Sequence, residues 1–144
     1  LKKSVDTFLK RNNLLNGEDV KIDILEISNP ETNAKVVAMM VAEGLQKRLP
    51  FRRVMKSTVE KVAANKDVLG IKITLGGRLG GADMARVETL KKGNIPLQTL
   101  RADIDFAREK AHMTYGVIGI KVWIYRGDTE KAKMTSQTAE VEEI

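Results

Sequence analysis

The sequence predicts an α+β fold: a two-layer domain with two helices on one face of a four-stranded antiparallel sheet. Apolar residues recur every three to four positions between residues 34 and 62, whereas from residue 71 to 124 they alternate with polar ones. Pro50 divides the helical part in two. Because the helices precede the strands and the links are short, an antiparallel sheet with both helices on one face is expected.

Residues 1–27 predict an additional helix, a turn near Gly17 and a half-buried strand from Val20 to Ile24. Asn29 is then expected to cap a helix that has Pro30 in its first turn and ends at Lys47 and Arg48. Its apolar stripe comprises Ala34, Val37, Ala38, Val41 and Leu45. Pro50 starts the next helix, whose apolar face comprises Phe51, Val54, Met55, Thr58 and Val62.

Four strands follow, each recognised by alternation of apolar and polar residues. One face of each is expected to carry, in order, Ile71, Ile73 and Leu75; Ala85, Val87 and Thr89; Leu100, Ala102, Ile104 and Phe106; and Ile118, Ile120, Val122 and Ile124. The segment 107–114 fits either a strand continuation or a helical turn. Residues 128–144 contain no aromatic residue and no clear periodicity, which predicts a flexible acidic tail.

Composition excludes several classes of function. The chain has 144 residues, of which 42% are hydrophobic, enough for one domain with a core. Without cysteine there is no disulfide scaffold or thiolate site, and His112 is the only histidine, so no metal site or cofactor is expected. The longest uncharged apolar run, 36–42, is far shorter than the roughly 18 residues of a membrane helix, and no signal peptide is visible.

Charge indicates the kind of partner. The chain carries 25 Lys and Arg against 19 Asp and Glu, a net charge of +6. Residues 127–144 contain two basic and five acidic residues, or −3, so residues 1–126 carry +9. A basic folded body predicts a polyanion, most simply nucleic acid. An anionic membrane surface fits less well, because no basic amphipathic helix stands alone.

The second central helix concentrates this charge. Residues 44–61 hold six basic residues and one acidic residue, Glu60. Arg52 and Arg53 fall in the first turn, where the helix dipole disfavours cations by about 0.3–1 kcal/mol each. Together with Lys56 they face away from Phe51 and Met55, as a track for a phosphate backbone would. An ordinary solvated face is the alternative.

The glycine-rich run GGRLGG at residues 76–81 contains Gly77-Arg78-Leu79-Gly80, which matches the GxxG pattern of KH domains. A KH GxxG joins two helices, however, whereas this one follows a strand. It also lacks the Gly-Lys-Ser/Thr of a phosphate-binding loop. We therefore expect the glycines to permit a tight turn, with Arg78 available to RNA.

Two other constellations have competing interpretations. Asp103 and Asp105 could hold a nuclease metal, but cross-strand pairing with Arg101, Arg86 or Lys121 is the preferred interpretation. His112 has no recognisable nucleophile nearby, so no enzyme is predicted.

Trp123, Tyr125 and Lys121 suit base stacking, although so few aromatic residues in the chain favour packing in an interface instead. Val36, Met39 and Met40 lie off the main apolar stripe, which fits either a protein contact or a widened core stripe.

Three segments carry a resemblance to a known family: Phe51 to Lys56 (FRRVMK), Gly77 to Arg86 (GRLGGADMAR) and the long block from Ile95 to Asp128. They resemble the bacterial-type small-subunit ribosomal protein S-three family. The resemblance implies that residues 1–28 are the end of a type II KH domain. It also implies that residues 29–127 form the carboxy-terminal α2β4 domain of the family. The family's own KH GxxG loop would lie upstream.

The resemblance also implies a function. It implies a structural protein of the small-subunit head that binds ribosomal RNA and contacts head proteins of the S-ten and S-fourteen families, on bacterial or organellar ribosomes. Arg52, Arg53 and Lys56 match the family's cations for incoming messenger RNA. The candidates for ribosomal RNA are Lys47, Arg48, Arg78, Arg86, Lys91 and Lys92. A non-ribosomal RNA-binding module is the alternative.

Overall fold

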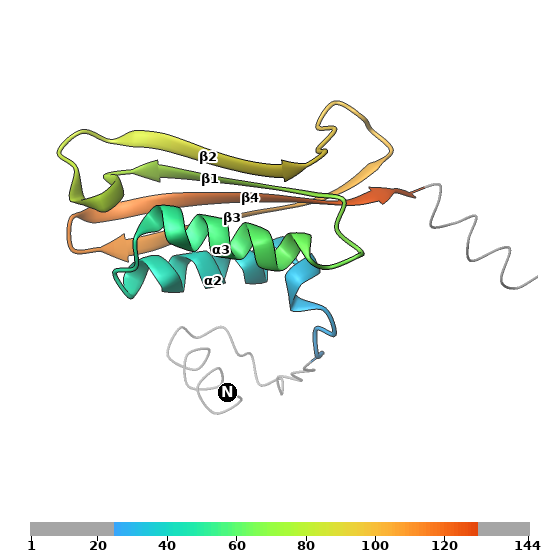
Figure 1. Ribbon diagram of the computed structural model, residues 1–144, viewed down its shortest axis with the longest axis horizontal. Helices are drawn as coiled ribbons and strands as arrows, with labels where there is room; N and C mark the ends of the chain where they lie inside the picture. The colour runs from blue at the N-terminus through green and yellow to red at the C-terminus, as the bar shows by residue number, and fades with distance from the viewer. Residues whose placement is uncertain (1–24, 130–144) are drawn as a thin grey trace, which may run out of the picture.

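The computed structural model describes residues 25–129, which form two layers (Figure 1). The helix and strand expected before residue 25 lie outside this part, as does the expected tail, 128–144, except for Asp128, which ends the last strand, and Thr129. The elements are η1 (Pro30–Thr32), α2 (Ala34–Gln46), α3 (Phe51–Ala63), β1 (Gly70–Gly77), η2 (Leu79–Gly81), β2 (Arg86–Gly93), β3 (Ala102–Met113) and β4 (Gly116–Asp128). The predicted α+β class with two central helices and four strands is confirmed.

The sheet has the strand order β2-β1-β4-β3, and every neighbouring pair is antiparallel. Residues 107–113 continue β3, which settles the ambiguity in favour of a strand. A two-residue turn, Thr114 and Tyr115, joins Met113 to its partner Gly116. Gly116 has a φ of 121°, a conformation that favours glycine.

The core lies between the sheet and the helices, on what we call the covered face of the sheet (Figure 1). Helix α2 packs under β3 and β4, and α3 packs under β1 and β2. The alternating residues of β1 and β4 reach the core as predicted: Ile71, Ile73, Leu75, Ile118, Ile120, Val122 and Ile124 are buried. The predicted stripes of both helices are buried as well, apart from Phe51, which is partly buried.

The start of α2 differs from the prediction. Asn29 makes no side-chain cap; instead, Pro30 begins the short turn η1. The cap of α2 is Asn33, whose side-chain oxygen accepts hydrogen bonds from the backbone N–H groups of Lys35 and Val36, at 3.0 and 3.3 Å. Asparagine suits both positions, so local preference alone did not distinguish them.

The other two strands place their expected apolar residues on the opposite face, which we call the open face. Leu100 is fully exposed and precedes β3, and Val87 is 70% exposed. In the register with β4, Ile104 and Phe106 lie on the open face, whereas Ala107 and Ala111 are buried against the helices; the register with β4 shifts only before Ile104. Small residues on the covered face of β3 leave room for α2.

Candidate nucleic-acid interface

The N-terminus of α3 presents its cations to solvent. Pro50 occupies the N-cap position, no side chain caps the helix, and no acidic residue lies in its first turn. Arg52, Arg53 and Lys56, here called the α3 patch, are all exposed, while Val54 is buried. Among the described residues, Arg53 and Lys56 have no ion-pair partner, so their charge is available to an external anion.

Arg52 belongs to a small network between α3 and β2. Its guanidinium lies 3.4 Å from Glu88, and the Arg86 guanidinium also lies 3.4 Å from the same carboxylate oxygen. Both guanidinium carbons lie over the Phe51 ring, at 5.7 and 5.6 Å from its centroid. Two arginines therefore share one carboxylate and one ring, so Arg86 adds a fourth cation to the patch.

The end of α2 brings Lys47 and Arg48 to the same end of the molecule. Lys47 lies 2.6 Å from Glu43 and lowers the pKa of that exposed carboxyl through a hydrogen bond and its charge. Arg48 has a φ of 60°, and the N–H groups of Arg48 and Leu49 bond to the carbonyls of Leu45 and Gly44. This is the helix-ending arrangement in which glycine is usual, so the backbone here holds an arginine at a cost of about 1 kcal/mol.

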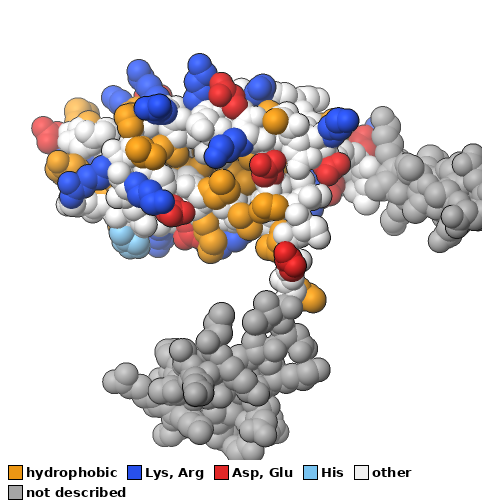
Figure 2. All heavy atoms as spheres, turned by 60° about the horizontal axis from the view of Figure 1, so that its bottom comes forward, with side chains coloured by type: hydrophobic (Ala, Val, Ile, Leu, Met, Phe, Trp, Pro, Cys, Tyr) orange, Lys and Arg blue, Asp and Glu red, His pale blue; other side chains and the backbone are white. Residues whose placement is uncertain are grey.

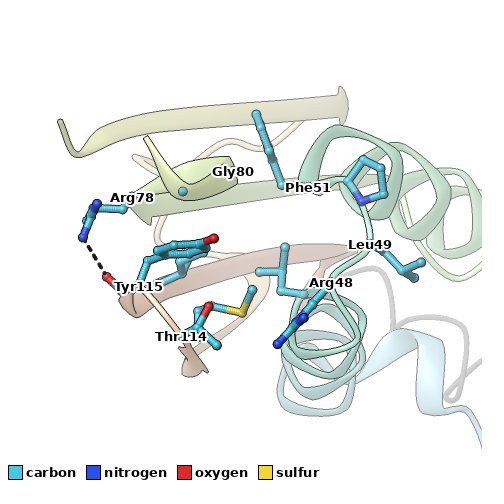
Figure 3. Close-up of a pocket in the computed structure, with 12 residues that line it drawn as sticks. Arg48, Leu49, Phe51, Arg78, Gly80, Thr114 and Tyr115 are labelled. Carbon is cyan, nitrogen blue, oxygen red and sulfur yellow. Dashed lines mark hydrogen bonds between the residues drawn. The ribbon is translucent and has the colours of Figure 1, made fainter. Parts of the chain in front are cut away.

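A cleft of about 600 Å³ opens beside Arg48, between the α2–α3 connection, η2 and the β3–β4 turn (Figure 3). Its walls include the rings of Phe51 and Tyr115 and the aliphatic side chains of Leu45 and Ile118. None of the residues lining it is acidic. The cleft is therefore apolar inside and cationic at its rim.

Arg78 closes one end of this cleft and is largely occupied by internal contacts (Figure 3). Its Nε donates to the Ala82 carbonyl at 2.9 Å and its Nη1 to the Tyr115 carbonyl at 3.3 Å, while Nη2 lies 3.3 Å from Asp83. The guanidinium also lies 5.8 Å from the Tyr115 ring centroid. Arg78 thus ties the glycine-rich turn to the β3–β4 turn, which leaves it less available to RNA than predicted.

The glycine-rich run makes a tight turn after β1, as its sequence predicts. Gly80 and Gly81 have φ values of 68° and 79°. A Cβ atom on Gly81 would lie 3.2 Å from the Tyr115 ring, so only glycine allows this approach without displacement. The run is a structural support for the cleft wall.

Lys91 and Lys92 lie away from these cations, near the far end of β2. They are about 17 Å or more along the strand from Arg86, at roughly 3.3 Å per residue. Their cross-strand partners are Lys72 and Ile71, so Lys91 lies on the open face and Lys92 on the covered face. The predicted RNA-contacting residues therefore divide into two regions.

The aspartate pair does not form a metal site. Asp105 accepts hydrogen bonds from the Ala34 backbone N–H at 2.8 Å and from Arg126 at 2.7 Å, whereas Asp103 is exposed. The ion-pair partner of Asp105 on β4 is Arg126, which was not among the predicted partners. Within residues 25–129 no group of three or more His, Asp or Glu side chains is arranged to hold a metal ion.

Two features of the surface are not visible in the sequence. Glu88 is the shared partner of Arg52 and Arg86, and its contact with Arg52 depends on how β2 lies beside α3. Phe106 lies beside Trp123 on the open face, with 5.1 Å between the ring centroids. Period-2 alternation placed each residue on a strand face, but the pairing of strands is a tertiary property.

The fold and its surface define a class: a basic α+β domain with the features of a nucleic-acid-binding protein. No helix in the described part of the chain is long and apolar enough to cross a membrane. Residues 41–124 match the family model described as "Ribosomal protein S3, C-terminal domain", and the chain belongs to this family.

Individual relatives support this assignment. The chain is 52% identical over 129 residues to the "Small ribosomal subunit protein uS3" of Novosphingobium aromaticivorans, covering 88% of this chain and 55% of that protein. It is 46% identical over 133 residues to the protein of the same name from Desulfitobacterium hafniense, covering 92% and 60%. The chain thus spans little more than half the length of these relatives.

Proposed function

We propose that the chain is a structural constituent of the small ribosomal subunit head, acting on cytoplasmic ribosomes without catalysis. It binds ribosomal RNA, and its α3 patch contacts messenger RNA where the messenger enters the subunit. The relatives carry the name of a small-subunit protein, which supports the assignment to this particle. The mechanism is electrostatic: cations on a rigid helix hold phosphates in place.

The observation that carries the proposal is the uncompensated charge of the α3 patch. The patch has four cations when Arg86 is included, and within residues 25–129 Glu88 is its one carboxylate partner. The helix N-terminus adds exposed backbone N–H groups and a partial positive charge, which favour phosphate. A merely solvated face would gain nothing from cations at this end of a helix.

Ribosomal RNA would contact the surrounding cations. Arg48 and Lys47 extend the α3 patch across the α2–α3 connection, and Lys91 and Lys92 would make separate contacts at the far end of β2. Arg78 would contribute through the turn that it holds in place.

Contacts with head proteins of the S-ten and S-fourteen families are part of the same proposal. Figure 2 shows exposed hydrophobic side chains in the middle of the helix-bearing side, with lysine and arginine side chains along one border. Met39 and Met40 of α2 are 52% and 42% exposed, which suits such a contact.

The test is a salt titration of single-stranded RNA binding by the full chain. The triple variant of Arg52, Arg53 and Lys56 to alanine should lower the slope of log affinity against log salt by about 0.7 per lost phosphate contact, or roughly 1.4–2.1 in all. Identical slopes for the two proteins would show that the α3 patch does not contact RNA.

A matched pair of double variants controls for net charge. Arg53→Ala with Lys56→Ala should weaken binding, whereas Lys61→Ala with Lys66→Ala, which removes the same charge from exposed positions near the end of α3, should change it little. Cosedimentation with small subunits separates a ribosomal protein from a free RNA-binding module. A chain that binds RNA but never cosediments would support the latter.

A further inference from the structure

The open face of the sheet is the largest feature that the α3 patch does not explain. Both helices lie on the covered face, so no described element packs against the open face (Figure 1). Alternate residues of all four strands point to it. In the register of the strands they form rows across the sheet, of which two neighbouring rows lie near its centre.

The first row combines cations with aromatic rings. It runs Lys91, Lys72, Trp123, Phe106 across β2, β1, β4 and β3. The Lys72 ammonium lies 5.0 Å from the centroid of the Trp123 ring, which in turn lies 5.1 Å from the ring of Phe106 at an interplanar angle of 37°. Phe106 remains 49% exposed. The row therefore contains a partly exposed pair of aromatic rings beside two lysines.

The second row is about 7 Å away, two residues along each strand at roughly 3.3 Å per residue. It runs Thr89, Thr74, Lys121, Arg108, with the two threonine hydroxyls 3.0 Å apart. Lys110 follows two residues beyond Arg108 on the same face. The five cations Lys72, Lys91, Arg108, Lys110 and Lys121 have no ion-pair partner among residues 25–129.

Two of these cations lie directly opposite two others. Lys72 faces Lys91, and Arg108 faces Lys121, in the register of the strands. Like charges in directly opposed positions destabilise a sheet. A carboxylate in place of one cation of each pair would turn the repulsion into attraction, but both pairs consist of two cations.

Carboxylates are instead confined to the covered face and the sheet margin. Glu88, Asp105 and Glu109 all contact residues of the helix layer or of its connections: Arg52, Ala34 and Lys35, respectively. Asp103 and Asp128 lie at the irregular end of β3 and β4, where Asp128 accepts a hydrogen bond from the Tyr125 hydroxyl at 2.9 Å. The two central rows of the open face therefore hold cations, aromatic rings and two threonines, and no carboxylate.

We propose that the open face is a second RNA-binding surface, which holds a short single-stranded segment. An unpaired base stacks on the exposed side of the Phe106–Trp123 pair, while Lys72 and Lys91 on one side and Lys121 and Arg108 in the next row bind adjacent phosphates. This inference rests on the proposed RNA-binding function but uses a face of the sheet opposite to the helix layer.

Single-stranded RNA fits this surface better than a protein does. A protein partner would be expected to meet a desolvated apolar centre, whereas here charged side chains from all four strands surround the rings. Phosphates would relieve the repulsion between the opposed cations, and a base would cover the rings. One ligand class thus satisfies both features.

Trp123 supplies a built-in reporter because it is the only tryptophan in the 144 residues. Titrating the full chain with a twelve-residue oligouridine, U12, should quench its fluorescence saturably. The quenching should persist in the Arg53→Ala, Lys56→Ala variant of the α3 patch. In the Arg108→Ala, Lys121→Ala variant, the affinity read by quenching should fall about tenfold, with a salt slope lower by about 1.4 for two lost contacts.

A second variant tests stacking separately from charge. Phe106→Ala should weaken the U12 affinity measured by quenching about fivefold or more while leaving the salt slope unchanged, because it removes a ring and no cation. Lys61→Ala with Lys66→Ala is the matched charge control, and a thermal melt checks that each variant is folded.

The outcomes separate the two proposals. RNA binding that is detected by anisotropy without any change in Trp123 fluorescence would overturn this inference and leave the α3 patch proposal standing. No binding at all would contradict both. Equal fluorescence changes with heparin, a polyanion without bases, would overturn the stacking surface and indicate a purely electrostatic face, open also to acidic protein segments.

Discussion

The two faces of one sheet use their charged residues in opposite ways. On the covered face each carboxylate joins the sheet to the helix layer, as Asp105 does by accepting from the first N–H of α2 and from Arg126. On the open face, cations face one another across the strands and no carboxylate neutralises them. The charged residues of the covered face therefore form ion pairs and hydrogen bonds that hold the fold together. Those at the centre of the open face are cations without ion-pair partners in the described part of the chain, as a site for a polyanion requires.

The largest effect on the free energy of unfolding should distinguish a buried residue of the covered face from an exposed residue of the open face. Ile73 is completely buried on the covered face, and Ile73→Ala should lower the free energy of unfolding by about 2–5 kcal/mol, through lost contacts and a cavity. Val87→Ala, at a 70% exposed position of the open face, should change it by no more than about 0.5 kcal/mol. Urea unfolding measures both, and similar losses would show that the open face is covered by another part of the chain.

The next effect concerns the carboxylate that holds α2. Asp105→Ala removes an acceptor from the Ala34 N–H and from Arg126, and should cost about 1–3 kcal/mol. Asp103→Ala, two residues away at an exposed position, is the matched control and should cost less than about 0.5 kcal/mol. Equal effects in thermal melts would mean that Asp105 does not anchor the helix.

A substitution at Arg48 is expected to stabilise the protein, by less than the preceding variants destabilise it. Arg48→Gly should raise the free energy of unfolding by up to about 1 kcal/mol, because glycine adopts the left-handed conformation without strain. The same variant should bind RNA more weakly, since it loses a cation beside the α3 patch. A variant that is more stable and binds RNA equally well would show that this strained arginine has no role in binding.

The smallest effect tests the repulsion on the open face. Lys121→Glu turns the like-charge pair with Arg108 into an opposite-charge pair, and should raise the free energy of unfolding by about 0.2–1 kcal/mol. It should also abolish the quenching of Trp123 by U12. Lys61→Glu on α3 is the control of equal charge change. Lower stability of the Lys121→Glu variant would contradict the assumed repulsion.

Much of the fold could be predicted because its signals are local. The alternation in β1 and β4 identified the buried residues correctly, and the stripe from Val54 to Val62 identified the buried face of α3. The third strand was harder. Its alternation placed Ile104 and Phe106 on one face, but it did not show that this is the open face; pairing with β4, whose buried residues are Ile118 to Ile124, decides that.

The candidate site shows the same division. The excess of cations near Pro50 is visible in the sequence, because it breaks a local preference of helix N-termini. The sharing of Glu88 by Arg52 and Arg86 was not visible, nor was the internal role of Arg78. The contacts of Arg52 with Glu88 and of Arg78 with Tyr115 join residues 36 and 37 positions apart. The sequence also does not show whether the donors of an arginine are free or occupied.

The sequence by itself determined the class of fold, the division of the helices at Pro50 and the basic character of the α3 patch, because periodicity, a missing backbone donor and charge are properties of short segments. Only the tertiary structure decided which cations remain unpaired and which rings meet. Trp123 meets Lys72 and Phe106 because the strand order β2-β1-β4-β3 places β4 between β1 and β3. Lys72 and Phe106 precede Trp123 by 51 and 17 positions in the chain. Pairing between strands depends on the burial of the whole covered face, and no local pattern records its result.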